Sequence, residues 1–235
     1  MASGTDTTAI KICGLARAND ARLAAQLGAD FLGLVLAESP RRVALRDARR
    51  WVAEIQAEFP DPRWVGVFVR PSKEEVRDAV AALGLDLVQV HGLRPEEGFA
   101  SPVPWIRAVP ASDLRAEEVP GGSEEMPAAP AAGPWALLVD SAGAGGSGGT
   151  GQSFDWNLLR DWKERSRVGA AGPRPNLLFL AGGLGPDNVR EAIRIVRPYA
   201  VDASSRLEAS AGRKDHQALR EFVRAVRDSD TPPGN

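Results

Sequence analysis

Eight short runs of apolar residues recur along the chain, and longer polar or amphipathic stretches separate them. Runs such as FLGLVL, WVGVFV and LLFLAG are almost continuously apolar, which is typical of parallel strands buried on both faces. The expected strands are Ala9 to Cys13, Phe31 to Leu36, Trp64 to Val69, Leu85 to Val90, Trp105 to Val109, Trp135 to Asp140, Leu177 to Ala181 and Ala200 to Ala203.

The segments between these runs show helical spacing. Asn19 to Leu27, Asp47 to Phe59 and Glu74 to Leu83 are amphipathic, and Ser72 with Glu75 predicts a capping box before the last of them. Eight alternations of strand and helix in 235 residues favour a single-domain (β/α)8 TIM barrel, an α/β fold that usually has about 250 residues. An open doubly wound sheet is the alternative.

The chain ends and one insert are expected to lie outside the barrel. We predict an N-terminal tail at 1–8, the barrel at 9–228 and a C-terminal tail at 229–235. After the fifth strand, the sequence GGSEEMPAAPAAGP is too rich in Pro, Gly and Ala to be entirely helical. We therefore predict a reduced helix there, followed by an exposed insert at about 120–134.

Charge and cysteine content exclude several classes of function. The chain has 29 basic and 31 acidic side chains, so it offers no electrostatic footprint for nucleic acid or an anionic membrane. No apolar run approaches the roughly 20 residues that span a bilayer, and no signal-peptide pattern opens the chain, so we expect a cytoplasmic protein. A single cysteine and two distant histidines, His91 and His216, predict neither a disulfide nor a metal site.

Residues able to carry chemistry stand at the C-terminal ends of the predicted strands, where active sites of such barrels lie. We expect these residues to face the same opening, at the C-terminal end of the barrel. They supply a thiol, an arginine, a histidine, carboxylates, glycines and hydroxyls. They are Cys13, Arg41, Gln89, His91, Asp140, Gly182, Gly183, Asp202, Ser204 and Ser205.

The segments AGGLGPDNV and Ser204-Ser205 predict a phosphate cradle. Loops after strands 7 and 8 of these barrels commonly bind phosphate through backbone N–H groups, and glycine allows the backbone to approach an anion closely. A tight turn without a ligand is the alternative. We expect a phosphorylated small molecule as the ligand.

The sequence leaves two possible roles open for each of three residues and one segment. Cys13 is either a small buried hydrophobe or a reactive group. Arg41 either pairs with a surface carboxylate or binds a ligand carboxylate with its planar fork. His91 either hydrogen-bonds locally or takes part in the chemistry. The glycine-rich stretch from Ser141 to Gln152 is either a flexible linker or a mobile lid over the mouth, and we predict the lid.

Taken in order, KICGL, GADFLGLVL leading to SPRRV, QVHG, LLVDS leading to GGTGQSFDW, LAGGLGPDNV and YAVDASS resemble the phosphoribosylanthranilate isomerase family of tryptophan biosynthesis. The resemblance runs from Lys11 to about Asp215. It implies a barrel that converts N-(5-phosphoribosyl)anthranilate to 1-(o-carboxyphenylamino)-1-deoxyribulose 5-phosphate by an Amadori rearrangement. It further implies no metal or organic cofactor, and we expect a monomer or homodimer.

The resemblance also assigns roles to the motif residues. It makes Cys13 the general base that removes the proton from C2 of the sugar, and Asp140 the general acid that protonates the ring oxygen. Arg41 resembles the contact to the anthranilate carboxylate, and Asp202 the group near the anthranilate nitrogen. The other implied substrate contacts are Gln89 and His91, with Gly182, Gly183, Ser204 and Ser205 at the phosphate.

Two departures from the family pattern lie near the site. Ala16 stands where the family usually has threonine. Arg206 stands where it usually has glycine, so either Arg206 adopts a less favoured backbone conformation or the loop is reshaped. Two other functions are alternatives. One is that of a related isomerase of histidine biosynthesis, which has an aspartate at the position of Cys13, and the other is that of a non-catalytic barrel that binds a phosphorylated ligand.

Overall fold

Eight parallel strands close into a barrel in chain order, with β8 hydrogen-bonded to β1. This closure confirms the predicted (β/α)8 fold and excludes the open sheet. The computed structural model describes residues 7–94, 97–116, 126–127, 133–140, 155–167 and 177–230. The barrel strands are β1 (Ala9–Ile12), β2 (Phe31–Val35), β3 (Arg63–Val69), β4 (Leu87–His91), β5 (Trp105–Pro110), β6 (Ala136–Asp140), β7 (Leu178–Ala181) and β8 (Ala200–Ala203).

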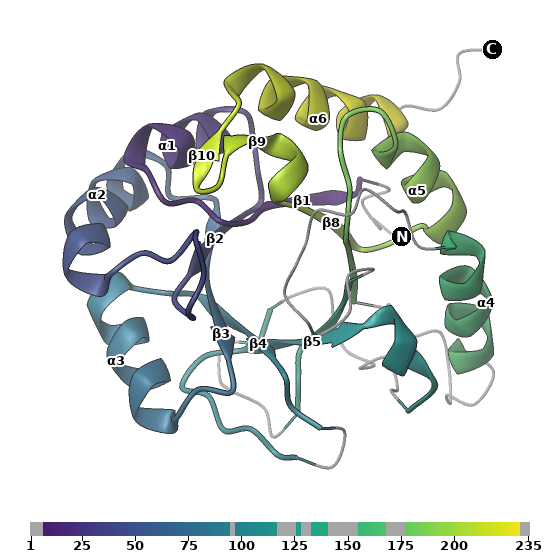
Figure 1. Cartoon of the computed structure of the whole chain (residues 1–235), viewed down its shortest axis with the longest axis horizontal. Coiled ribbons are helices and arrows are strands. Elements are labelled where there is room, and N and C mark those ends of the chain that lie inside the picture. Colours follow the sequence, from purple (N-terminus) through teal and green to yellow (C-terminus); the bar gives the residue numbers. More distant parts are fainter. Residues whose placement is uncertain are drawn as a thin grey trace, which may run out of the picture.

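Among the described residues, six helices lie around the outside of the barrel, which Figure 1 shows in a view along its axis, and the described part of the connection between β4 and β5 carries no helix. The predicted capping box at α3 is confirmed, because the Ser72 side chain accepts from the Glu75 N–H at 3.1 Å and Glu75 accepts from the Ser72 N–H at 2.7 Å. The helices are α1 (Ala18–Gln26), α2 (Leu45–Glu58), α3 (Lys73–Leu83), α4 (Trp156–Arg167), α5 (Val189–Val196) and α6 (His216–Ser229).

Two connections contain shorter elements. The 3-10 helix η1 (Ala111–Ala116) follows β5 and confirms the reduced helix predicted there. After β8 come the 3-10 helix η2 (Ser205–Leu207) and a small hairpin of β9 (Glu208–Ser210) and β10 (Arg213–Lys214). Most of the predicted insert at 120–134 and the whole predicted lid, Ser141 to Gln152, lie outside the described residues.

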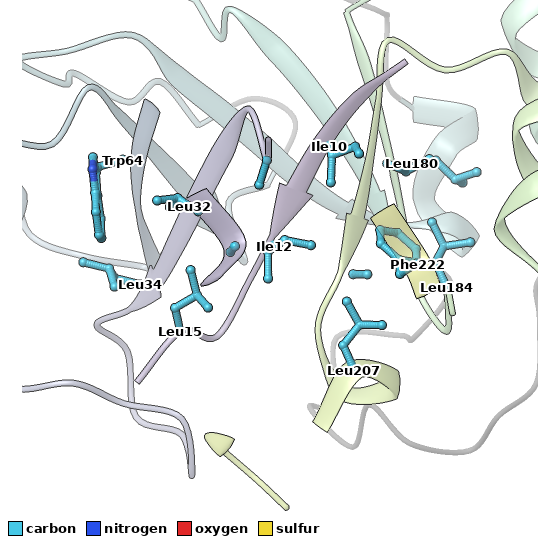
Figure 2. Close-up of a cluster of buried hydrophobic side chains, with 14 of the residues drawn as sticks. Ile10, Ile12, Leu15, Leu32, Leu34, Trp64, Leu180, Leu184, Leu207 and Phe222 are labelled. Atoms are coloured by element: carbon cyan, nitrogen blue, oxygen red, sulfur yellow. The ribbon is translucent and has the colours of Figure 1, made fainter. Parts of the chain in front are cut away.

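The main apolar core lies between the barrel and its helices. Alternate strand residues point outward, and Ile10 and Ile12 of β1 pack in this layer with Leu32 of β2 and Phe222 of α6 (Figure 2). No helix in the described part of the chain combines the length and the apolar character that crossing a membrane requires.

The barrel interior changes character from one end to the other. Near the N-terminal ends of the strands it is filled by an aromatic floor, composed of Phe31, Trp135, Phe179 and Tyr199, with the Phe31 and Phe179 ring centroids 5.2 Å apart. The inward positions nearer the C-terminal ends carry Lys11, Gln89 and Asp202, all of which are buried. The mouth of the barrel is therefore the polar end, as expected for an active site in this fold.

Candidate active site

Cys13 follows β1 directly and extends its pairing with β8, because its N–H donates to the Ala203 carbonyl at 2.9 Å. It continues the inward-facing row of Ala9 and Lys11. Its side chain is buried, yet Cys13 belongs to neither of the two apolar clusters of the fold. Gly33 of β2 makes room for it, since a Cβ at Gly33 would lie 3.0 Å from the Cys13 Sγ.

Lys11 is the buried cation of the site. It is paired in register with Asp202 across β1 and β8, and its Nζ donates to the Asp202 carboxylate at 2.9 Å. Burial alone lowers the pKa of Lys11, but Asp202 and the adjacent Cys13 more than compensate, so the pKa is raised. Breaking such a buried pair typically costs about 3–5 kcal/mol.

Charges on both sides act on the Cys13 thiol. Burial raises its pKa above the ordinary value, and the Lys11 ammonium opposes this rise through charge and a hydrogen bond. The Asp202 carboxylate adds to the rise, and Lys214 of β10 opposes it. The thiol is thus buried among charged groups, and it is the only cysteine of the chain.

Gln89 and His91 point inward from β4, and the Gln89 Nε2 lies 2.7 Å from the His91 Nε2. Burial, together with the Lys11 ammonium, lowers the pKa of His91 to about 4, so the imidazole is neutral at physiological pH. The Gln89 Oε1 is buried and has no hydrogen-bond partner within the described part of the structure. This oxygen is an acceptor suited to a ligand hydroxyl.

Asp140 is the last residue of β6 and is partly exposed. Leu138, two residues earlier, belongs to the apolar cluster inside the barrel, and Leu137 and Val139 pack outside it. By the alternation of strand residues, Asp140 therefore faces the interior at the mouth.

Arg41 is held by a carboxylate of this chain. Its Nε and Nη2 donate to Glu208 at 2.8 and 2.7 Å, and the Glu208 side chain is buried. Burial raises the pKa of Glu208, but Arg41 and then Lys214 outweigh it, so the pKa is lowered. The Lys214 Nζ binds both Glu208 and the Ser204 carbonyl, each at 3.1 Å.

Gly14 allows Arg41 to lie close to the end of β1. It has a φ of +72°, a conformation that favours glycine. A Cβ at Gly14 would lie 2.8 Å from the Arg41 Cδ and 2.9 Å from the Ser204 Oγ. The glycine thus allows the predicted carboxylate-binding and phosphate-binding residues to meet at the end of β1.

The two loops that are predicted to bind phosphate follow the neighbouring strands β7 and β8. Gly182 and Gly183 follow β7 with φ of +91° and +64°, and the Asn188 side chain orders their loop by donating to the Gly183 carbonyl at 2.9 Å. Ser204 and Ser205 follow the neighbouring strand β8. The glycines and hydroxyls of the two predicted loops therefore lie at the same end of the barrel.

Arg206 joins the two loops of the cradle. Its Nη1 donates to the Gly183 carbonyl at 3.2 Å and its Nη2 to Asp187 at 2.9 Å. Arg206 lies within η2, and it is not among the described non-glycine residues with positive φ, which are Arg70 and Arg197. The backbone therefore accommodates arginine without the strain considered from the sequence.

The structure gathers the predicted residues at one end of the barrel and adds others. Lys11, Glu208, Lys214 and Asn188 were not predicted from the sequence. Lys11 had a detectable signal, because a lysine between two isoleucines in a strand buried on both faces has to be paired inside the barrel. The other three lie in loops or a short hairpin, where no periodicity indicates which side chain turns inward.

Known proteins resemble the chain over nearly its full length. The family model described as N-(5'phosphoribosyl)anthranilate (PRA) isomerase matches residues 10–225. A protein of Stutzerimonas stutzeri (strain A1501) named N-(5'-phosphoribosyl)anthranilate isomerase is 42% identical over 226 residues, covering 92% of this chain and 96% of that protein.

Two solved structures share the fold. Phosphoribosyl anthranilate isomerase in complex with reduced 1-(o-carboxyphenylamino)-1-deoxyribulose 5-phosphate is 31% identical, with a TM-score of 0.70, and the match covers 94% of this chain and 100% of that one. A structure of monomers generated from the dimeric enzyme of Thermotoga maritima is 30% identical, with the same TM-score and coverage.

Proposed function

Because the chain belongs to the N-(5'-phosphoribosyl)anthranilate isomerase family, and is thus an isomerase of tryptophan biosynthesis, we propose that Cys13 and Asp140 are its general base and general acid. The observation that carries this assignment is the position of the single thiol. Cys13 lies at the mouth on the inward row of β1, among charged groups.

Ring opening is the first step. Asp140, in its protonated form, donates a proton to the ring oxygen of the ribose. The bond between C1 and that oxygen breaks, and the nitrogen lone pair of the anthranilate forms an iminium with C1. The inward position of Asp140 at the end of β6 supports this role.

Proton abstraction follows. The Cys13 thiolate removes the proton from C2, and the C2–H electrons neutralise the iminium to give an enolamine. The enolamine becomes the ketone when C1 gains a proton and the C2 hydroxyl loses one, so atoms and charge balance without an added reactant. A thiolate is the form of cysteine that accepts a proton.

Other residues bind the ends of the substrate. Arg41 meets the anthranilate carboxylate, and the buried Glu208 fixes its guanidinium in place. Asp202 faces the anthranilate nitrogen. Gln89 and His91 bind sugar hydroxyls, a role that the unpartnered Gln89 Oε1 supports.

The function is tested by turnover. Purified protein should remove phosphoribosylanthranilate, generated in place because it is labile, with loss of its fluorescence. Binding without turnover would instead favour a barrel that only holds a phosphorylated ligand.

The phosphate cradle makes a separate prediction. In crystals soaked with inorganic phosphate, the anion should lie about 2.7–3.2 Å from backbone N–H groups of the Gly182-Gly183 loop and the Ser204-Ser205 loop. Phosphate should also inhibit turnover competitively, since it occupies the place of the substrate's phosphate. An anion bound at the aromatic floor, with the cradle empty at high phosphate, would contradict this prediction.

Gly14→Ala should raise KM at least tenfold, because the new Cβ displaces Arg41 and Ser204. Gly28→Ala is the matched control. Gly28 has a similar φ, +82°, but a Cβ there meets nothing within 4 Å. Both variants should lose about 1–2 kcal/mol of stability from the strained backbone. Only Gly14→Ala should impair substrate binding, and an equal KM in the two variants would speak against the arrangement.

Partners and location remain predictions. A Thermotoga maritima relative is described as dimeric, and light scattering would distinguish a monomer from a homodimer for this chain. We propose a cytoplasmic enzyme that binds neither nucleic acid nor a membrane and needs no cofactor. Activity that is retained after exhaustive chelation would support the proposal that the enzyme needs no metal.

A further inference from the structure

The Lys11 side chain has no exposure to solvent and lies two residues before Cys13 on the inward row of β1. Its ammonium has two acceptors. One is the Asp202 carboxylate at 2.9 Å, and the other is the sulfur of the neighbouring Cys13, which is buried beside it on the same row. A fully buried lysine is uncommon and requires compensating partners. Here one partner is the group that has to become an anion for catalysis.

We propose that Lys11 is a positioning residue of the isomerase, whose buried ammonium lies between Asp202 and Cys13 and stabilises the thiolate form of Cys13 against the cost of burial. The inference rests on the proposed role of Cys13 as the base. It adds the group that makes a buried thiol able to act as one, because a thiolate without a cation in this interior would be desolvated and uncompensated.

Two other cations act on Cys13, and both bind the same carboxylate, Glu208 of β9. Arg41 donates two hydrogen bonds to Glu208, and Lys214 binds the same carboxylate at 3.1 Å. His91, across the interior on β4, is neutral at physiological pH, since its pKa is about 4. Of these cations, Lys11 is the one that lies on the same inward row of β1 as the thiol.

The opposite charges of Lys11 and Asp202 should shift the pKa of the Cys13 thiol in opposite directions when each is removed. Removing the Lys11 charge takes away a cation and should raise the thiol pKa. Neutralising Asp202 takes away an anion, leaves Lys11 to Cys13 alone, and should lower the thiol pKa. A residue that merely filled space or held the fold would not shift the thiol in opposite directions when the two partners are changed.

The experiment is the pH dependence of alkylation by iodoacetamide in Lys11→Met, Lys11→Arg, Asp202→Asn and the wild type. Because Cys13 is the only cysteine, the alkylation rate reports on it directly. At a pH below the thiol pKa, the rate falls about tenfold for each unit by which that pKa rises, apart from a partial offset from higher nucleophilicity. We expect at least a fivefold slower rate in Lys11→Met, a faster one in Asp202→Asn, and a Lys11→Arg profile close to wild type.

Turnover gives the second measurement. The rising limb of kcat/KM with pH should move to higher pH in Lys11→Met and return in Lys11→Arg. If Lys11→Met fails to fold, Lys11→Met/Asp202→Asn, which removes both charges, replaces it. That double variant should alkylate more slowly than Asp202→Asn alone.

The outcomes separate the two proposals. An alkylation profile unchanged or shifted to lower pH in Lys11→Met, or shifted to higher pH in Asp202→Asn, would overturn the role of Lys11. It would leave the isomerase assignment intact if the wild type turns over. Absence of turnover in the wild type, with the opposite shifts present, would instead overturn Cys13 as the base while the coupling of Lys11 to the thiol stands.

Discussion

Replacing Cys13 with alanine is expected to lower kcat at least a hundredfold, because the variant has no group at the mouth of β1 that can take the proton from C2. General base catalysis contributes about 10² to 10⁴ in rate, and a hundredfold loss corresponds to about 2.7 kcal/mol of barrier. The melting temperature should change little. The measurement is turnover under conditions where the wild type is active, with thermal unfolding followed in parallel.

Cys13→Ser provides the matched variant, since serine keeps the size of the side chain but is a far weaker base at neutral pH. It should be about as inactive as Cys13→Ala. A cysteine that only filled the core would behave in the opposite way, with near-normal turnover and a loss of stability from the smaller side chain. That result would return Cys13 to the role of a buried hydrophobe.

Asp140→Asn should also lower kcat at least a hundredfold, because an amide cannot donate a proton to the ring oxygen. The substrate should still bind, since Arg41, Asp202 and the cradle are unchanged. Asp78→Asn is a suitable control, because this exposed residue of α3 is 66% exposed and pairs only with its neighbour Arg77 in the described structure. Turnover of Asp140→Asn within threefold of that control would refute the assignment.

The sequence predicts the barrel well because its strands are buried on both faces. A run such as FLGLV has no polar residue that would suit it to the protein surface, so it predicts a buried strand. The boundaries differ by one or two residues, as at β4, which was expected from Leu85 to Val90 and spans Leu87–His91. His91 thereby belongs to the strand instead of the following loop.

The charged contacts of the site are much less accessible to sequence reasoning. The sequence predicts Arg41 as a site residue, but its bidentate partner Glu208 is 167 positions away along the chain. Pairing at that separation depends on the hairpin of β9 and β10, whose short strands leave no periodic pattern. For Arg206 the sequence predicts an unfavourable backbone conformation or a reshaped loop, whereas in the structure its side chain connects two loops.

The aromatic floor has a consequence for how such a protein can change over generations. Phe31, Trp135, Phe179 and Tyr199 stabilise the barrel at the end opposite Cys13 and Asp140. Substitutions that alter the mouth therefore leave these packing contacts in place, and substitutions in the floor affect folding before they affect chemistry. A lineage that carries this fold can acquire a new substrate by exchanging residues at one end while the other end keeps it folded.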